Sequence, residues 1–207
     1  AKFSQYGLEA NKGYVARVQL GTATNTLDAD GEVIAEQDIP VIDEARLQGV
    51  LQSLTGYLMQ VPPMVSALKH QGQPLFKLAR QGVEIERPPR AIQIFVNELL
   101  KFDANEGWLE IRVHCSKGTY IRSLAESIAD QLHTVAHLSA LRRELSGGFT
   151  LDHAHSWLAL QSTCEAAEGD PETLLKPVDA ILSHFPRLDL TENECITLIQ
   201  GKKVSGK

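Results

Sequence analysis

Alternating apolar and polar positions predict the strands of this chain. Trp108–Cys115 alternates in the way expected of a strand with one buried face. Its apolar positions are Leu109, Ile111 and Val113. Ala91–Phe102 precedes it, and we predict that the two segments pair as a hairpin across residues 103–107. Tyr14–Leu20 and Glu32–Ala35 are predicted to be two further strands, the second entered through a turn at Asp28–Gly31.

Helical periodicity predicts two amphipathic helices and a third, shorter one. Asp43–Leu54 begins with a capping residue and carries one apolar stripe, and Thr119–Leu132 follows a Ser-Lys-Gly-Thr turn. Pro74–Gln81 is a short helix with proline at its first turn. Ser66–His70 before it is expected to be a strand, and the Thr-rich segment Gly21–Leu27 is expected to be a loop.

These elements predict an α+β fold, with a mixed, largely antiparallel sheet flanked by helices and a basic insert at 61–89. The chain has 207 residues, 43% of them hydrophobic, which is enough for one domain with a small appendage. No apolar run has membrane-spanning length, and the N-terminus lacks a signal-peptide core, so we expect no membrane association. The three cysteines are far apart and fit a reducing cytoplasm.

The charge distribution leaves a nucleic-acid partner open although the net charge is -6. Residues 61–122 hold 9 Lys/Arg against 6 Asp/Glu, whereas 1–60 and 147–207 each carry a net charge of -4. Phosphate binding needs a local positive field rather than a basic protein, so RNA is a candidate partner. Ordinary surface charge explains the same distribution, and the sequence does not choose between the two explanations.

Arg122 is the unusual residue of the predicted helix Thr119–Leu132. A cation in the first helical turn opposes the helix dipole, so we expect an anionic partner for it, which this chain need not contain. Two other motifs carry less weight. Gly201–Lys207 has P-loop spacing but follows a segment that is more helical than extended, and His153-x-His155 has no third metal ligand at a telling distance.

Five segments occur together in the order and spacing of a known family. They are Lys12-x-Tyr14, Leu20-Gly21-x-x-Thr24-x-Thr26-x-Asp28-x-x-Gly31, Val61-Pro62-Pro63-Met64-x-Ser66-Ala67-x-Lys69, Cys115-Ser116-Lys117-Gly118-Thr119-Tyr120-Ile121-Arg122, and Ala136-His137-Leu138-x-x-Leu141-Arg142-Arg143. As a set they resemble the TruB family of bacterial tRNA pseudouridine synthases, which isomerise the T-loop uridine at tRNA position 55. The resemblance extends from Lys2-Phe3-Ser4-Gln5-Tyr6 to about Arg187.

The resemblance implies a site that flips a uridine into a pocket, where an aspartate attacks it. Tyr14 would stack on the flipped base, and Tyr120 and Leu141 would contact the target nucleotide. Arg122 would hold the nucleophilic aspartate ionised and aimed. Asp28 is expected near the pocket, although turn formation alone explains an aspartate there. T-arm phosphates would be bound by Lys69, Lys77, Arg80, Arg87, Arg90, Arg142 and Arg143.

The departures from the family concern the catalytic group. The family's nucleophilic aspartate lies in a His-Thr-Gly-Ala-Leu-Asp-Pro segment upstream of the matched region, so we expect this sequence alone to lack the nucleophile and to form no pseudouridine. Val65 stands where the family commonly has tyrosine, and Ala1 where it usually has threonine. Residues 1–187 would be the N-terminally truncated catalytic domain, and 188–207 the start of an RNA-binding PUA-like domain.

The reaction requires no metal or organic cofactor, and the expected partner is the T-arm stem-loop of tRNA, bound by a monomer in the cytoplasm. Two alternatives stay open. One is a non-catalytic RNA-binding or RNA-chaperone module that binds a T-arm without chemistry. The other is a sister pseudouridine synthase for another RNA, which would share the pocket and differ in the insert and tail.

Overall fold

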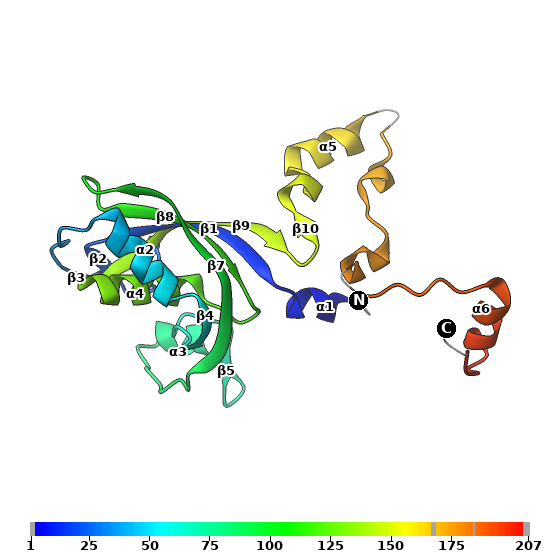
Figure 1. Ribbon diagram of the computed structural model, residues 1–207, viewed down its shortest axis with the longest axis horizontal. Helices are drawn as coiled ribbons and strands as arrows, with labels where there is room; N and C mark the ends of the chain where they lie inside the picture. The colour runs from blue at the N-terminus through cyan, green and yellow to red at the C-terminus, as the bar shows by residue number, and fades with distance from the viewer. Residues whose placement is uncertain (1–2, 167–168, 184, 205–207) are drawn as a thin grey trace.

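A six-stranded sheet dominates the computed structural model, which describes residues 3–166, 169–183 and 185–204 (Figure 1). The strand order is β10-β9-β1-β8-β7-β4, and every pair of neighbours is antiparallel. The strands are β1 (Lys12–Leu20), β4 (Gly56–Gln60), β7 (Arg90–Asp103), β8 (Trp108–Cys115), β9 (Ala136–Ser146) and β10 (Phe149–Thr150). The α+β class is confirmed, but the sheet is more uniformly antiparallel than expected. A parallel contact joins Asp28 to Leu138, and it is an isolated bridge rather than a pair of strands.

The centre of the sheet follows the sequence pattern closely. In β8 exposure alternates residue by residue, and the apolar positions Leu109, Ile111 and Val113 are fully buried. The predicted hairpin is present, with β7 and β8 paired on either side of residues 104–107. Strand β1 lies between β8 and β9, and its residue Ala16 is opposite Ile111 on one side and Leu141 on the other. The sequence therefore predicted β1, β7 and β8 as strands and the pairing of β7 with β8, but it did not predict β9 or its pairing with β1.

Two helices cover one face of the sheet and close the core. Helix α2 (Glu44–Ser53) packs on β7, and α4 (Ile121–Leu132) packs on β9 and β1 (Figure 1). Asp43 caps α2, because its carboxylate accepts a hydrogen bond of 2.7 Å from the Arg46 amide. The apolar stripe of α4 is buried and contributes Leu124, Ile128 and Leu132 to the same core. Both helices were predicted, and both begin within two residues of the expected position.

The sequence described two segments less well. The Thr-rich segment Gly21–Leu27 is not entirely a loop, because β2 (Thr22–Thr24) pairs with β3 (Val33–Glu36). The strand expected at Ser66–His70 is present only at its last two residues, as β5 (Lys69–His70). It pairs with β6 (Gln73–Pro74) in a short hairpin that is followed by α3 (Leu75–Arg80). Since β4 ends at Gln60 and its neighbour β7 begins at Arg90, residues 61–89 are a long connection between adjacent strands.

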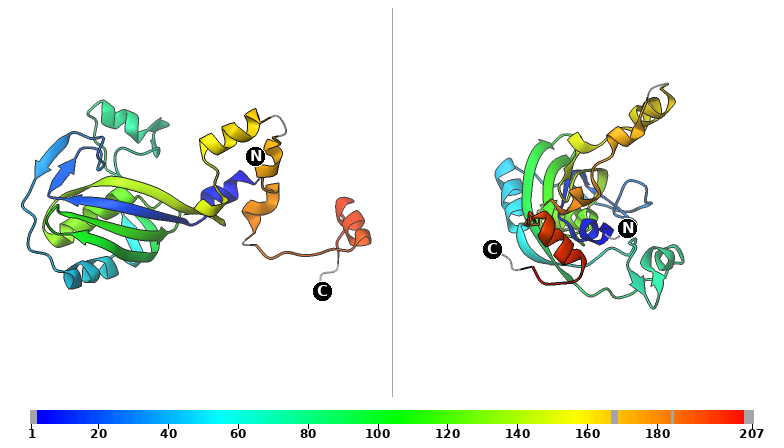
Figure 2. Two further views of the ribbon diagram at one scale, coloured as in Figure 1. Left: turned by 90° about the horizontal axis from the view of Figure 1, so that it is seen from above. Right: turned by 90° about the vertical axis from the view of Figure 1, so that its right-hand side faces the viewer.

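The two ends of the chain extend away from the sheet, which gives the molecule an elongated shape (Figures 1 and 2). They carry α1 (Ser4–Glu9), α5 (Trp157–Glu165) and α6 (Glu192–Ile199), none of which has a buried residue. Helix α6 confirms the expected helix before the P-loop-like motif. That motif therefore lacks the preceding strand that such a phosphate site needs, and its last residues, 205–207, lie outside the described part of the chain.

Candidate functional site

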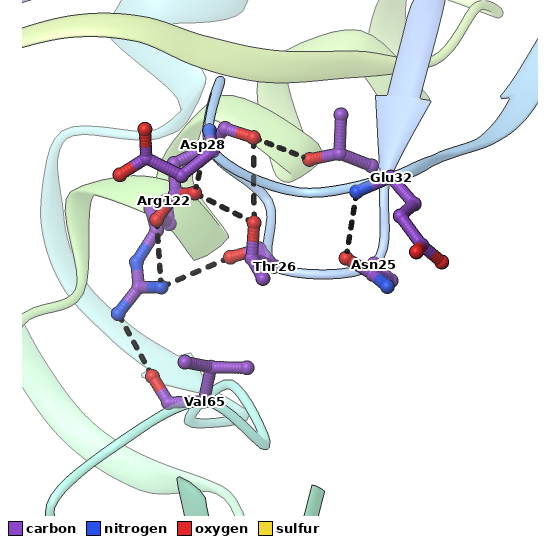
Figure 3. Close-up of polar contacts among 8 residues, drawn as sticks. Asn25, Thr26, Asp28, Glu32, Val65 and Arg122 are labelled. Atoms are coloured by element: carbon purple, nitrogen blue, oxygen red, sulfur yellow. Dashed lines mark hydrogen bonds and ion pairs between the residues drawn. The ribbon is translucent and has the colours of Figure 1, made fainter. Parts of the chain in front are cut away.

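The guanidinium of Arg122 lies at the start of α4 and joins three segments that are far apart in the sequence (Figure 3). Its Nη1 donates hydrogen bonds to the Thr26 carbonyl at 2.9 Å and to Asp28 Oδ2 at 3.1 Å. Its Nη2 donates to the Val65 carbonyl at 2.8 Å. Arg122 is thereby fixed between the loop after β2 and the insert. The expected tyrosine at position 65 is not needed for this contact, because the acceptor is a main-chain oxygen.

Asp28 is also fixed by several hydrogen bonds. Thr26 Oγ1 donates to Asp28 Oδ1 at 2.6 Å, and the buried Thr24 hydroxyl donates to the Asp28 carbonyl at 2.7 Å. The carboxylate also accepts a hydrogen bond of 3.3 Å from the Asp30 amide, as is common for an aspartate at a turn. Thr26 and the turn therefore orient the carboxylate, while Thr24 fixes the main chain of Asp28.

The ion pair between Arg122 and Asp28 gives the cation in the first helical turn the anionic partner that we expected for it. This partner lies within the chain, 94 residues away, and the pairing of Arg122 with the family's nucleophilic aspartate stays a prediction. The two side chains are 22% and 33% exposed, so water still reaches the pair. A second aspartate from another segment would therefore approach an arginine that is already paired with the Asp28 carboxylate.

A cavity of about 750 Å³ opens beside this ion pair. Its volume lies in the range of ~300–1,000 Å³ that is typical of small-molecule sites. Its walls come from the loop after β2, the insert and the start of α4. They include the predicted residues Asp28, Arg80, Tyr120 and Arg122, and also Asn25, Thr26, Asp30, Val65, Ser66, Ala67, Phe76 and Ala79. Aromatic and charged groups therefore face one space, as an RNA base and its phosphate would require.

Leu141 lies beside Arg122, whereas Tyr14 lines neither of the two hollows around Arg122. Leu141, which is half exposed, lines a second hollow of about 390 Å³ together with Asp28 and Arg122. Tyr14 on β1 is opposite Arg143 on β9, two residue pairs along from the Ala16–Leu141 pair. Burial raises the pKa of the Tyr14 hydroxyl, and the nearby Cys115 adds to this, whereas Arg143 opposes it. Tyr14 is therefore a neutral, half-buried ring at neutral pH.

The basic residues predicted to bind phosphates fall into separate groups. Lys69 is exposed on β5, and Lys77 and Arg80 lie in the last turn of α3. Arg90 is exposed at the start of β7, and Arg142 and Arg143 are exposed on β9. Arg87 differs from the others, because its side chain is only 20% exposed and pairs with Glu84 at 3.5 Å. Arg87 is the least accessible of this set to an RNA phosphate.

Eight of the cavity residues were not predicted to belong to the site, and Phe76, Ser66 and Asn25 are among them. Phe76 lies in the wall, and the Arg80 guanidinium is 5.6 Å from the centre of its ring. Ser66 is buried, and its hydroxyl has no hydrogen-bond partner among the described residues. Asn25 Oδ1 accepts a hydrogen bond from the Glu32 amide, which keeps the loop closed (Figure 3). Ser66 is a defining position of one of the five segments, Asn25 is an unspecified position of another, and Phe76 lies in none of them.

Residues suited to a metal do not gather in the described ranges, where no group of three His, Cys, Asp or Glu side chains could hold an ion. His153 instead caps a short turn, since its Nδ1 accepts a hydrogen bond from the Thr150 amide at 3.1 Å. Cys115 is buried, and Cys164 and Cys195 are exposed free thiols. None of the helices in the described ranges has the length and apolar character that crossing a bilayer requires.

Similarity to known proteins assigns the chain to a family. Residues 1–121 match the model of the TruB family pseudouridylate synthase (N terminal domain). The chain is 46% identical over 192 residues to the tRNA pseudouridine synthase B of Neisseria gonorrhoeae (strain NCCP11945), covering 93% of this chain and 61% of that protein. The chain therefore belongs to the TruB family of pseudouridylate synthases.

Other relatives agree with this assignment. The tRNA pseudouridine synthase B of Chromobacterium violaceum (strain ATCC 12472) is 45% identical over 203 residues, which cover 98% of this chain and 64% of that protein. The chain thus spans about three fifths of the length of these curated relatives. A crystal structure of a Cbf5-Nop10-Gar1 complex superposes with a TM-score of 0.69 at 23% identity, covering 97% of this chain and 51% of that one. This likeness supports the fold.

Proposed function

We propose that this chain forms most of the uridine pocket of a tRNA pseudouridine synthase, which isomerises the T-loop uridine at position 55 of tRNA. The observation that carries the proposal is the Arg122–Asp28 pair at the wall of a cavity of about 750 Å³, in a chain of the TruB family. The substrate would be tRNA, recognised at its T-arm, and the reaction would use no cofactor.

The reaction breaks the N1–C1′ bond of uridine, rotates the base and joins C5 to C1′. A base in a folded T-loop must first leave its stack, and it would then rest against Tyr14, with Tyr120 and Leu141 as further walls. Arg122 would attract the family's nucleophilic aspartate and keep it ionised, because an opposite charge nearby lowers a carboxyl pKa. Asp28 would keep Arg122 in the required orientation while that aspartate attacks.

The insert at 61–89 would bind the RNA backbone. Arg80 lines the cavity, and Lys69 and Lys77 belong to the same insert. Arg90, Arg142 and Arg143 are exposed on the sheet and would extend this basic surface. Arg87 would belong to the same set of phosphate-binding residues, although its side chain is less exposed than the others. Residues 188–207 would begin a C-terminal PUA-like domain that adds RNA contacts, and the protein would act as a cytoplasmic monomer.

Binding of a fluorescent T-arm stem-loop, measured by anisotropy over a range of salt concentrations, tests the proposal with the chain as given. We expect specific binding whose salt slope falls by about one phosphate contact in Lys77→Glu and in Arg80→Glu. Lys101→Glu is the matched control, because Lys101 lies at the far end of β7 and stacks on Trp108. Equal binding of a scrambled hairpin, or an equal loss in the control, would contradict the proposal.

A further inference from the structure

The short segment Gln60–Val65, at the exit from edge strand β4, makes four polar contacts with the start of α4. The Gln60 side chain forms two of them, both with the main chain of Tyr120. The Val61 carbonyl accepts a hydrogen bond of 3.1 Å from Ser123 Oγ, and the Val65 carbonyl accepts the one from Arg122 already described. One segment thus holds α4 at residues 120, 122 and 123.

The side-chain amide of Gln60 forms two hydrogen bonds with the same residue, Tyr120, and we call this pair of bonds the clamp. Its Oε1 accepts a hydrogen bond of 2.8 Å from the Tyr120 amide, and its Nε2 donates one of 3.0 Å to the Tyr120 carbonyl. Only 9% of Gln60 is exposed, and both bonds are partly buried. An amide side chain is suited to this task, because it offers one donor group and one acceptor side by side.

Tyr120 is the residue on which the geometry of the helix start depends. It occupies the N-cap position of α4 with extended backbone angles, and no side chain of its own caps the helix. Its carbonyl also accepts the first intrahelical hydrogen bond, from the Leu124 amide at 3.1 Å. Unsatisfied groups at a helix start are normally paired by a local cap. Here a residue 60 positions earlier fixes the N-cap backbone.

We propose that Gln60 is a positioning residue for the reaction, acting through Tyr120 and Arg122. This inference rests on the proposed function. The clamp fixes where α4 begins, and Arg122 lies two residues further on, so a shift of the N-cap moves the guanidinium relative to Asp28 and the cavity. Gln60 itself is not among the residues that line the 750 Å³ cavity. Its loss should therefore affect the rate of reaction more than the binding of RNA.

The test compares Gln60→Met with Gln19→Met in the protein that carries the upstream aspartate segment of its family. Methionine keeps the length of glutamine and removes both hydrogen-bonding groups. Gln19 is a matched control, because its Nε2 donates to the Glu106 and Gly107 carbonyls at 2.9 and 3.2 Å, at the turn of the β7–β8 hairpin. The measurements are the single-turnover rate of pseudouridine formation, the dissociation constant for a T-arm stem-loop, and amide exchange at Tyr120.

We expect Gln60→Met to lower the single-turnover rate about 10- to 100-fold, to change the RNA dissociation constant less than about 3-fold, and to speed exchange at the Tyr120 amide. Gln19→Met should leave all three unchanged. An unchanged rate in Gln60→Met, or equal losses of rate and binding, would overturn the positioning role while leaving the proposed function intact. An inactive parent protein would overturn the proposed function, and the positioning role with it.

Discussion

Asp28→Asn should weaken the folded state measurably, because it removes the charge that Arg122 faces. Asparagine keeps an oxygen that can accept from Thr26, but its NH2 group would face Arg122 Nη1 in place of the accepting Oδ2. The substitution therefore removes the charge and the hydrogen bond to Arg122 together, while the shape of the loop is kept. Arg122 would keep its two carbonyl acceptors, Thr26 and Val65, and should stay in place. The loss therefore measures the ion pair rather than a collapse of the site.

The size of the effect follows from distance and exposure. Two unit charges 3.1 Å apart attract by about 1.3 kcal/mol in water and about 5 kcal/mol at an effective dielectric constant of 20. Arg122 and Asp28 are 22% and 33% exposed, between a surface pair and a buried one. After desolvation is subtracted, we expect a coupling energy of about 1.5–2 kcal/mol.

A double-mutant cycle in urea, with Arg122→Met, Asp28→Asn and the double variant, measures this coupling directly. The matched control is Arg187 with Asp189, a pair whose atoms are closer, at 2.8 Å, but whose side chains are 83% and 77% exposed. We expect at most about 0.5 kcal/mol for the control pair. A coupling below about 0.5 kcal/mol for Arg122 and Asp28, or equal values for both pairs, would refute the reasoning from burial.

Three further predictions concern the scaffold. Ile128→Ala removes a fully buried side chain of α4 and should cost about 3 kcal/mol, measured as a lower urea midpoint. Gly118→Ala should cost about 1 kcal/mol, because Gly118 has a φ of +78° and its Cβ would meet no atom, so only backbone strain is added. Partial desolvation and then Asp130 raise the pKa of Glu126, although Arg87 opposes this, so the folded state binds its proton more tightly than the unfolded state and loses stability as pH rises through the raised pKa. Glu126→Gln should therefore raise the melting temperature at pH 7 and leave it unchanged below the ordinary pKa of glutamate; a gain at both pH values would contradict this.

Local patterns in the sequence predicted the elements that have one buried face. The alternation in Trp108–Cys115 and the apolar stripe of α4 appear in the structure as a central strand and a core helix. The Thr-rich loop was predicted less well, because its short strand β2 is stabilised by pairing with β3 rather than by an apolar face. Its threonines act through their hydroxyls, which bind the main chain and carboxylate of Asp28.

The contacts that build the site could not be read from local patterns, because they join distant residues. Asp28 and Arg122 are 94 positions apart, and Gln60 and Tyr120 are 60 apart. The sequence indicated that Arg122 needs an anion but left its position open, and the family resemblance suggested an upstream aspartate rather than Asp28. The family resemblance singled out Tyr120, Arg122 and Asp28 for the site. It gave no role to Gln60 or Phe76, whose placement depends on how the insert folds back.

Pseudouridine formation on a T-arm stem-loop tests the central claim most directly. The chain as given would be compared with the same chain joined to the family's upstream aspartate segment, and with a third form in which that aspartate is replaced by asparagine. The account predicts turnover by the joined chain alone. Turnover by the chain as given, or by the asparagine form, would contradict it, and so would tight RNA binding by all three forms without any turnover.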